Sequence, residues 1–244
     1  MENKLDFEQM WLRKFATALD EFASERVREE VMQGSEELSS ASEREDVICW
    51  SQQAMERLVT AVDEKQARDT MTSCACQYPK ANLRDVRSAY EETGNVDVAL
   101  GMLQEKFETF LRQTMHLEEE MITQIVNKGW GSAGVRMGDT IIATKIPKGG
   151  YLVQYMNEPD PDKRRALYCH CPRIRDVPKT SQTIPPIYCY CGAGFYKGIW
   201  EEILQEPVEV ELLESVLKGD NVCKVAIHLP LADFGCSERE RAAS

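Results

Sequence analysis

Apolar residues recur at helical spacing through the first half of the chain. Between Phe7 and Val27 they fall mostly three or four positions apart, and Glu, Arg and Lys fill most positions between them. This pattern is typical of a helix with one buried face. Further helices are expected near residues 47–62, 82–92 and 97–129. Gly94 is expected to end the third helix and Asp97 to cap the fourth. The pattern predicts a helical region over residues 1–128.

The pattern changes at the glycine-rich segment 129–134. Beyond it, β-branched runs alternate with turn residues, which indicates strands. Strands are expected at 140–144, 149–153, 208–213 and 222–229, a helix at 194–204 and a loop at 159–186. The last two strands flank a Gly-containing turn, which predicts a hairpin. We therefore expect the α+β fold class, with a helical N-terminal half, an antiparallel-sheet α+β domain at 129–236 and a flexible tail at 237–244.

Charge narrows the classes of partner. The chain has 244 residues, with 29 Lys and Arg against 41 Asp and Glu, and a formal net charge of −12. Nucleic-acid phosphates need a basic surface, and an anionic membrane repels an acidic protein. We therefore expect neither as a partner. No apolar run of 18 residues occurs, and the N-terminus lacks the basic start and apolar core of a signal peptide. These features predict a cytoplasmic protein with reduced thiols.

Nine cysteines are the most informative residues of the sequence. Six fall in three Cys-x-Cys pairs, which are Cys74 with Cys76, Cys169 with Cys171, and Cys189 with Cys191. Zinc takes four ligands and accepts thiolates. The pairs at 169–171 and 189–191 make one complete four-thiolate set, with 17 residues between them. The sequence therefore predicts a metal site at these four cysteines.

Several features of this metal site stay open. Cys74 and Cys76 either join the helical half to the same site or belong to a second one. His170 is a substitute ligand, because imidazole also binds zinc. Four thiolates suit an iron–sulfur cluster as well as zinc. Each Cys-x-Cys chelate needs a turn, since residues two apart in a strand lie about 6.5–7 Å apart. Pro172 and the glycines after Cys191 supply the turns.

Other interpretations of the cysteines compete with a metal site. Free cysteine is among the most buried residue types, so the pairs could fill the core. Redox pairs or a nucleophilic thiol are further alternatives. Cys49 and Cys223 are best interpreted as core residues, and Cys236, near the charged tail, carries no functional signal.

Three consecutive segments of the last third resemble a known pattern. They are Gly194–Leu204 (GFYKGIWEEIL), Pro207–Glu211 (PVEVE) and Lys218–Ile227 (KGDNVCKVAI), with Ser215 before the last. Their order resembles the C-terminal half of 4-vinyl-reductase-type domains and is similar to that of L-2-amino-thiazoline-4-carboxylic acid hydrolase-like proteins. The whole chain also looks like a bacterial family of unknown function with tyrosine-flanked Cys-x-Cys pairs.

This resemblance implies an α+β ligand-binding fold. Members bind small, often hydrophobic molecules, and some carry cysteine-bound zinc. In the pattern, Cys223 occupies the cysteine after Gly-Asp, a metal or thiol position, which competes with its interpretation as a core residue. A similar fold alone does not identify the function of a protein.

Three functions follow as hypotheses. The first is a small-molecule-binding or sensing protein with a cysteine-ligated metal, whose pocket lies between the sheet and the helix 194–204. Phe195, Tyr196 and Trp200 would line that pocket, although plain core is an alternative for all three. The second is a hydrolase acting on a C–N bond through an open zinc or a thiolate. The third is a protein whose metal only joins its two halves. The expected partner is a small-molecule ligand, and a homodimer is left open.

Overall fold

The computed structural model describes residues 6–230. Its helices are α1 (Phe7–Phe22), α2 (Glu25–Val31), α3 (Arg44–Ala61), α4 (Glu64–Ser73), α5 (Arg84–Thr93), α6 (Val96–Gln113), α7 (Glu119–Asn127), α8 (Leu152–Asn157), α9 (Pro161–Tyr168) and α10 (Tyr190–Leu204). Its strands are β1 (Val135–Met137), β2 (Thr140–Thr144), β3 (Glu209–Glu214) and β4 (Lys224–His228). Short 3₁₀ turns are η1 (Ser35–Glu37), η2 (Lys80–Leu83), η3 (Gly149–Tyr151), η4 (Val177–Lys179), η5 (Pro186–Cys189) and η6 (Val216–Lys218). The α+β fold class predicted from the sequence is confirmed.

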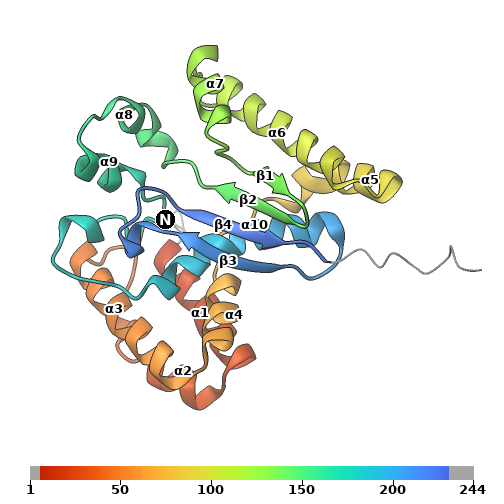
Figure 1. Cartoon of the computed structure of the whole chain (residues 1–244). Helices are drawn as coiled ribbons and strands as arrows, with labels where there is room; N and C mark the ends of the chain where they lie inside the picture. Colours follow the sequence, from red (N-terminus) through yellow and green to blue (C-terminus); the bar gives the residue numbers. More distant parts are fainter. Residues whose placement is uncertain (1–5, 231–244) are drawn as a thin grey trace, which may run out of the picture.

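The four strands form one antiparallel sheet in the order β1-β2-β4-β3. The central strands β2 and β4 pair from Thr140 opposite His228 to Thr144 opposite Lys224. Strands β3 and β4 form the predicted hairpin. Figure 1 shows α5, α6 and α7 on one side of the sheet and α1 to α4 on the other. The sheet therefore lies between two groups of helices from the N-terminal half.

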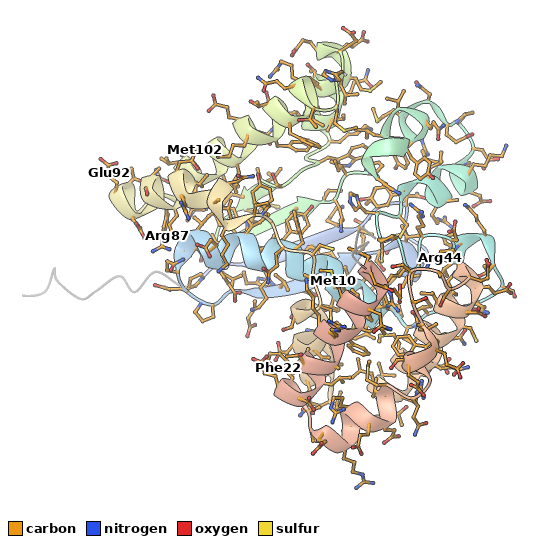
Figure 2. The ribbon with its side chains drawn as sticks, turned by 180° about the vertical axis from the view of Figure 1, so that it is seen from behind. Met10, Phe22, Arg44, Arg87, Glu92 and Met102 are labelled. Carbon is orange, nitrogen blue, oxygen red and sulfur yellow. The ribbon has the colours of Figure 1, made fainter. Side chains whose placement is uncertain are left out.

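Helix α10 lies against the sheet and connects it to the helices. It packs against β3 and β4 and also against α4 and α5. In Figure 2, seen from behind, α10 lies in front of the strands. Tyr196, Ile199 and Trp200 are buried within these contacts. Because α10 contacts the helices α4 and α5 as well as the strands β3 and β4, it joins the two parts of the chain.

One hydrophobic core crosses the predicted joint at 129–134. The same cluster of buried residues contains Phe15 and Leu58 from the helical region and Trp200 and Ile227 from the α+β region. The regions 1–128 and 129–236 therefore describe the order of the chain, while their cores are continuous. At the joint, Gly131 has a φ of +132° and packs on the Phe107 ring, which leaves no room for a Cβ atom. Glycine permits this backbone conformation and close approach.

The N-terminal helices follow the expected pattern with different boundaries. Gly94 ends α5 in the left-handed conformation, as predicted. The first helix stops at Phe22, and Ser24 caps α2 through its hydroxyl. Asn95 caps α6, so the prediction that Asp97 does so was wrong. The helix expected over 97–129 is broken between α6 and α7, where His116 adopts a positive φ of 52°.

Two local expectations for the C-terminal half were wrong. Residues 149–153 were expected to form a strand, but they form η3 and the start of α8. The helix is favoured because Leu152 and Tyr155, three positions apart, bury the same face. The loop expected over 159–186 contains α9, which begins with an Asp160 cap and Pro161 in its first turn. The predicted tail 237–244 and Cys236 lie outside the described residues.

No helix within residues 6–230 combines the length and the apolar character needed to cross a membrane.

Candidate functional site

Six cysteines lie at the ends of elements that meet beside the N-terminal end of α10. We refer to Cys74, Cys169, Cys171, Cys189, Cys191 and Cys223 as the thiol cluster. Cys74 follows the last residue of α4, and Cys169 follows the last residue of α9. Cys189 ends η5, Cys191 lies in the first turn of α10, and Cys223 directly precedes β4. Elements distant in the sequence therefore bring these thiols into one region.

Tyr168 holds one side of the thiol cluster together. Its hydroxyl oxygen accepts a hydrogen bond from the Cys223 N–H at 2.9 Å and donates to the Lys145 carbonyl oxygen. The Lys145 N–H donates to the Cys223 carbonyl oxygen at 2.9 Å. These bonds join the end of β2, the start of β4 and the segment that carries Cys169. Burial raises the pKa of Cys189, and the neighbouring Cys223 and Cys169 thiols raise it further.

The other side of the thiol cluster faces α4. The Cys191 thiol donates to the Cys74 carbonyl oxygen at 3.5 Å. Burial and the neighbouring Cys171 thiol raise the pKa of Cys191 to about 12. The pKa of Cys74 is also raised, by burial and by the Cys191 thiol. Cys171 itself is half-buried, and its sulfur lies 3.8 Å from the Tyr188 hydroxyl oxygen.

Helical geometry separates the cysteines of the 189–191 pair. The sequence predicted a chelating turn here, but the chain passes from η5 directly into α10. Two helical positions correspond to a rotation of about 200°, so such side chains point to opposite sides. The thiols that raise the pKa of Cys189 are accordingly those of Cys223, Cys169 and Cys171, whereas Cys191 neighbours Cys171, Cys76 and Cys74. The prediction of a turn was wrong, and the two thiols lie on different sides of the thiol cluster.

Polar groups and a lysine accompany the buried thiols. The Trp11 indole and the Ser215 hydroxyl oppose part of the rise that burial causes in the pKa of Cys191 and of Cys189 respectively, although the buried indole nitrogen of Trp11 forms no hydrogen bond within the described residues. Burial raises the pKa of Cys169 and Cys223 as well, while the Lys145 ammonium group opposes the rise. These groups favour the thiolate form, although burial keeps the thiols uncharged near neutral pH in the absence of a metal.

Lys145 occupies an unusual position for a lysine of an acidic protein. It is half-buried, and no Asp or Glu of the described chain forms an ion pair with it. A Cβ atom at Gly192, in the first turn of α10, would lie 3.6 Å from its ammonium nitrogen. Loss of hydration and the ammonium groups of Lys145 and Lys148 lower the pKa of His170 to about 4. His170 is therefore a neutral imidazole at physiological pH.

A buried ion pair lies directly beside the thiol cluster. The Glu8 Oε1 atom lies 2.7 Å from Arg173 Nε and 2.6 Å from Arg173 Nη2. The Arg173 side chain is 1% exposed and that of Glu8 is 3% exposed. Burial lowers the pKa of Arg173, but Tyr188 and Glu8 outweigh it and raise the pKa overall. This pair joins α1 to the segment that follows Cys171.

The structure brings together most, but not all, of the predicted metal ligands. Cys74, Cys169, Cys171, Cys189 and Cys191 belong to the thiol cluster, while Cys76 is exposed at its edge. Cys223, for which a core position and a metal or thiol position competed, lies within the cluster. Cys49 is exposed on α3, so its interpretation as a core residue was wrong. Among residues 6–230, no three His, Cys, Asp or Glu side chains are already arranged around a single metal position.

The three predicted pocket aromatics occupy different environments. Tyr196 and Trp200 are fully buried core residues. Phe195 lines a cleft of about 650 Å³ that lies between α10 and residues 72–80, rather than between α10 and the sheet. The Phe195 ring meets the Tyr78 ring edge-on at 6.1 Å. The cleft was missed in the sequence because its second wall follows α4, far from α10 along the chain.

The cleft has a charged rim and a glycine floor. Lys80 pairs with Glu202 at 2.8 Å, and Lys197 pairs with Glu201 at 2.8 Å. The Arg87 guanidinium also approaches Glu202, at 3.7 Å, and Figure 2 shows Arg87 on α5 beside α10. Gly198 lies in the lining, and no atom lies within 4 Å of the place where its Cβ would be. The cleft therefore has open space above this glycine.

Comparison with known proteins gives one match. Residues 164–232 match the model of DUF6144, a family of unknown function. No curated protein and no solved structure matches the chain. These comparisons do not test the resemblance to 4-vinyl-reductase-type domains, which therefore stays a prediction. The matched segment contains every residue of the thiol cluster except Cys74. The similarity to DUF6144 therefore covers most of the thiol cluster and identifies no activity.

Proposed function

We propose that the chain binds a thiophilic metal at the thiol cluster, with zinc as the first candidate and an iron–sulfur cluster as the alternative. The observation that carries this proposal is that six thiols from separate elements, two of them buried and four half-buried, neighbour one another beside the N-terminal end of α10. Thiolates are the ligands that zinc and iron–sulfur clusters take from proteins. We also propose a cytoplasmic location, where thiols stay reduced.

The surroundings of the thiol cluster support metal binding over simple core filling. Core cysteines need no polar partners, because they behave as small hydrophobic residues. Here Tyr188 approaches Cys171 and Lys145 approaches Gly192 in the first turn of α10. A zinc ion with four thiolates carries a charge of about −2. The nearby Lys145, which forms no ion pair within the described residues, would offset part of that charge.

Metal binding requires local rearrangement of the thiol cluster. The sulfur atoms of a four-thiolate zinc lie less than about 4 Å apart. Changes of side-chain rotamer would have to bring the ligands to that spacing. Cys169, Cys171, Cys189 and Cys223 are the strongest ligand candidates, because burial and neighbouring thiols place them in one environment. Cys191 and Cys74 are the candidates on the α4 side.

The thiolate form of the hydrolase hypothesis receives less support from this environment. A nucleophilic cysteine acts as the thiolate, which a lowered pKa favours. Burial instead raises the pKa of Cys74, Cys169 and Cys189. A metal-bound thiolate does not face this penalty, because the metal displaces the proton. Binding is therefore the better supported role for these thiols.

Elemental analysis of protein purified without added metal or chelator tests the proposal. We expect about one zinc per chain or, for an iron–sulfur cluster, about two or four iron atoms per chain. Cys171→Ser should lose most of the metal, because Cys171 adjoins thiols on both sides of the cluster. Cys49→Ser is the matched control, since Cys49 is exposed on α3. Metal-free wild-type protein in which all nine thiols react after unfolding would contradict the proposal.

The cleft beside Phe195 supports a second candidate function, the binding of a small molecule. Its volume of about 650 Å³ is within the range of small-molecule sites. The Tyr78 and Phe195 rings offer an apolar wall, and the ion pairs of Lys80 with Glu202 and of Lys197 with Glu201 offer polar groups of both charges at the rim. A ligand with a flat apolar body and a charged group fits these walls. Its body would lie over Gly198.

Filling the cleft tests this second function. Gly198→Leu should weaken binding of a probe set of aromatic carboxylates and aromatic amines, measured by NMR shifts of residues 194–198. Gly101→Leu is the matched control, because Gly101 also lies in a helix with no atom within 4 Å of a Cβ. If no probe shifts these signals in the wild-type protein, the cleft is not a site for such ligands.

A further inference from the structure

Arg173 is surrounded by groups from both halves of the chain. Its guanidinium carbon lies 3.8 Å from the centre of the Trp11 ring, 5.6 Å from that of Trp50 and 6.0 Å from that of Tyr188. Trp11 belongs to α1 and Trp50 to α3. A guanidinium group in this position gains cation–π attraction in addition to its ion pair with Glu8.

Arg173 is connected to the thiol cluster through one hydroxyl group. Arg173 Nη1 donates to the Tyr188 hydroxyl oxygen at 3.0 Å. This bond occupies a lone pair of the oxygen, so the Tyr188 proton is free to point elsewhere. The Cys171 sulfur lies 3.8 Å from the same oxygen. The Tyr188 hydroxyl therefore has an acceptor in the thiol cluster.

The opposite end of this connection is α1. Glu8 lies in the first turn of α1 and meets Arg173 through a single carboxylate oxygen. Trp11, one helical turn later, stacks on Tyr188 with ring centres 5.7 Å apart. Arg44, labelled in Figure 2 at the start of α3, donates to the Pro172 carbonyl oxygen at 3.2 Å. The segment between Cys171 and Arg173 is thus held by the N-terminal helices.

We infer that the Glu8–Arg173–Tyr188 chain couples the docking of α1 to occupancy of the thiol cluster. This inference rests on the proposed function. A thiolate accepts a stronger hydrogen bond than a neutral thiol, because charge-assisted bonds are roughly twice as strong. Occupancy would therefore strengthen the bond from Tyr188 to Cys171 and, through Arg173, the attachment of Glu8. Coupling of this kind is reciprocal, so docked α1 also favours the occupied cluster.

The Glu8–Arg173–Tyr188 connection links the thiol cluster to α1, which lies at the surface of the protein. The outer face of α1 carries Phe7 and Met10, which are exposed apolar residues, while Trp11 and Phe15 face inward. Looser docking of α1 would change the exposure of the inward residues. Occupancy of the thiol cluster is thereby converted into a change in the N-terminal helices, which is the response that a sensor requires.

Hydrogen exchange with and without zinc tests the coupling. In the wild-type protein, zinc should slow exchange of the hydrogen-bonded α1 amides by about tenfold, a moderate coupling. In Tyr188→Phe, zinc should still bind, but the gain in α1 protection should fall below about twofold. Tyr190→Phe is the matched control, because its buried hydroxyl accepts the Leu212 N–H and, within the described residues, forms no hydrogen bond with Cys171.

The possible outcomes distinguish the proposed coupling from the proposed metal binding. Full zinc-dependent protection of α1 in Tyr188→Phe would overturn the coupling while leaving metal binding intact. Failure of the wild-type protein to bind zinc or iron would instead overturn the proposed function. If Tyr188→Phe does not fold, Glu8→Gln is used, which leaves Tyr188 and Cys171 in place. We expect it to weaken zinc affinity about tenfold in chelator competition and to shift the sulfur-to-metal absorption of the cobalt form. Unchanged values for both would again overturn the coupling.

Discussion

Gly194 of α10 lies directly against the backbone carbonyl of Thr72 in α4. A Cβ atom at position 194 would lie 2.7 Å from the carbonyl carbon of Thr72 and closer still to its oxygen. Thr72 is two residues before Cys74, and Gly194 is three residues after Cys191. The close approach of the two helices therefore determines how the α4 side of the thiol cluster meets the α10 side.

Gly194→Ala should be strongly destabilising, because its Cβ would collide with backbone that cannot move alone. We expect a loss of about 3 kcal/mol in the free energy of unfolding, at the upper end of overpacking costs. Denaturant unfolding measures it. Gly198→Ala is the control, since its Cβ would meet no atom within 4 Å. It should be neutral or stabilising by about 0.5–1 kcal/mol, because alanine favours the helix. Equal effects of the two substitutions would show that the helices do not approach closely here.

The buried pair of Glu8 and Arg173 should be costly to break. Removing one partner leaves the other charge buried and unpaired, so Glu8→Gln should lower the free energy of unfolding by about 3–5 kcal/mol. The exposed pair of Asp176 and Lys179 is the control, and Asp176→Asn should cost less than about 1 kcal/mol.

A double substitution separates charge from packing at the same site. Replacing both partners, as in Glu8→Gln with Arg173→Met, removes the unpaired charge and should be less destabilising than Glu8→Gln alone. The measurement is a double-mutant cycle from denaturant unfolding. If the two effects simply add, the buried groups do not interact energetically.

The attachment of α1 should weaken in acid. The Asp6 carboxylate accepts hydrogen bonds from the Gln9 N–H at 3.0 Å and from the Ser40 hydroxyl at 2.7 Å. These bonds lower the pKa of Asp6 in the folded protein. The stabilisation is therefore complete above the unfolded-state pKa of about 4 and is lost as the pH falls through the folded-state pKa.

Hydrogen exchange of the first turn of α1 between about pH 5 and pH 2.5 measures this loss of stability. Asp6→Asn should flatten its pH dependence, because the amide still accepts a hydrogen bond but has no carboxyl proton to gain. Ser40→Ala should keep a pH dependence, with a smaller amplitude. A profile that Asp6→Asn leaves unchanged would assign the acid sensitivity to other groups.

Sequence reasoning predicted the elements better than the site. Helical and β periodicity identified the α+β class, the hairpin of β3 and β4 and the Gly94 helix end, since these depend on local patterns. The Cys-x-Cys pairs indicated the region of the thiol cluster. The pattern could not show that α10 begins at Tyr190 and separates Cys189 from Cys191, because the glycines that follow also suit a turn.

The sequence pattern could not predict contacts between segments that lie far apart along the chain. The Glu8–Arg173 pair spans 165 positions, and neither residue differs locally from a solvated charge. Lys145 follows a strand, and no local sequence signal indicates its role either. Such partners become visible only once α1, β2 and α10 are packed together. The Gly-Asp-x-x-Cys motif suggested a metal or thiol role for Cys223, which stays a prediction, while the structure packs the half-buried Cys223 side chain against a hydrophobic core cluster.

Lys145 should determine how strongly the thiol cluster holds its metal. Its ammonium group is the cation beside the first turn of α10, and it opposes the burial penalty on the Cys169, Cys191 and Cys223 thiolates. Lys145→Met should therefore weaken zinc affinity about tenfold or more in chelator competition, since a partly buried charge interaction exceeds 1.4 kcal/mol. Lys145→Arg should retain most of the affinity. Lys128→Met is the control, because it removes the same positive charge at a different place, where the Lys128 ammonium nitrogen lies 5.5 Å from the centre of the Trp130 ring. Equal zinc affinities of the Lys145→Met and Lys128→Met proteins would show that net charge alone, and not the position of Lys145, matters at the site.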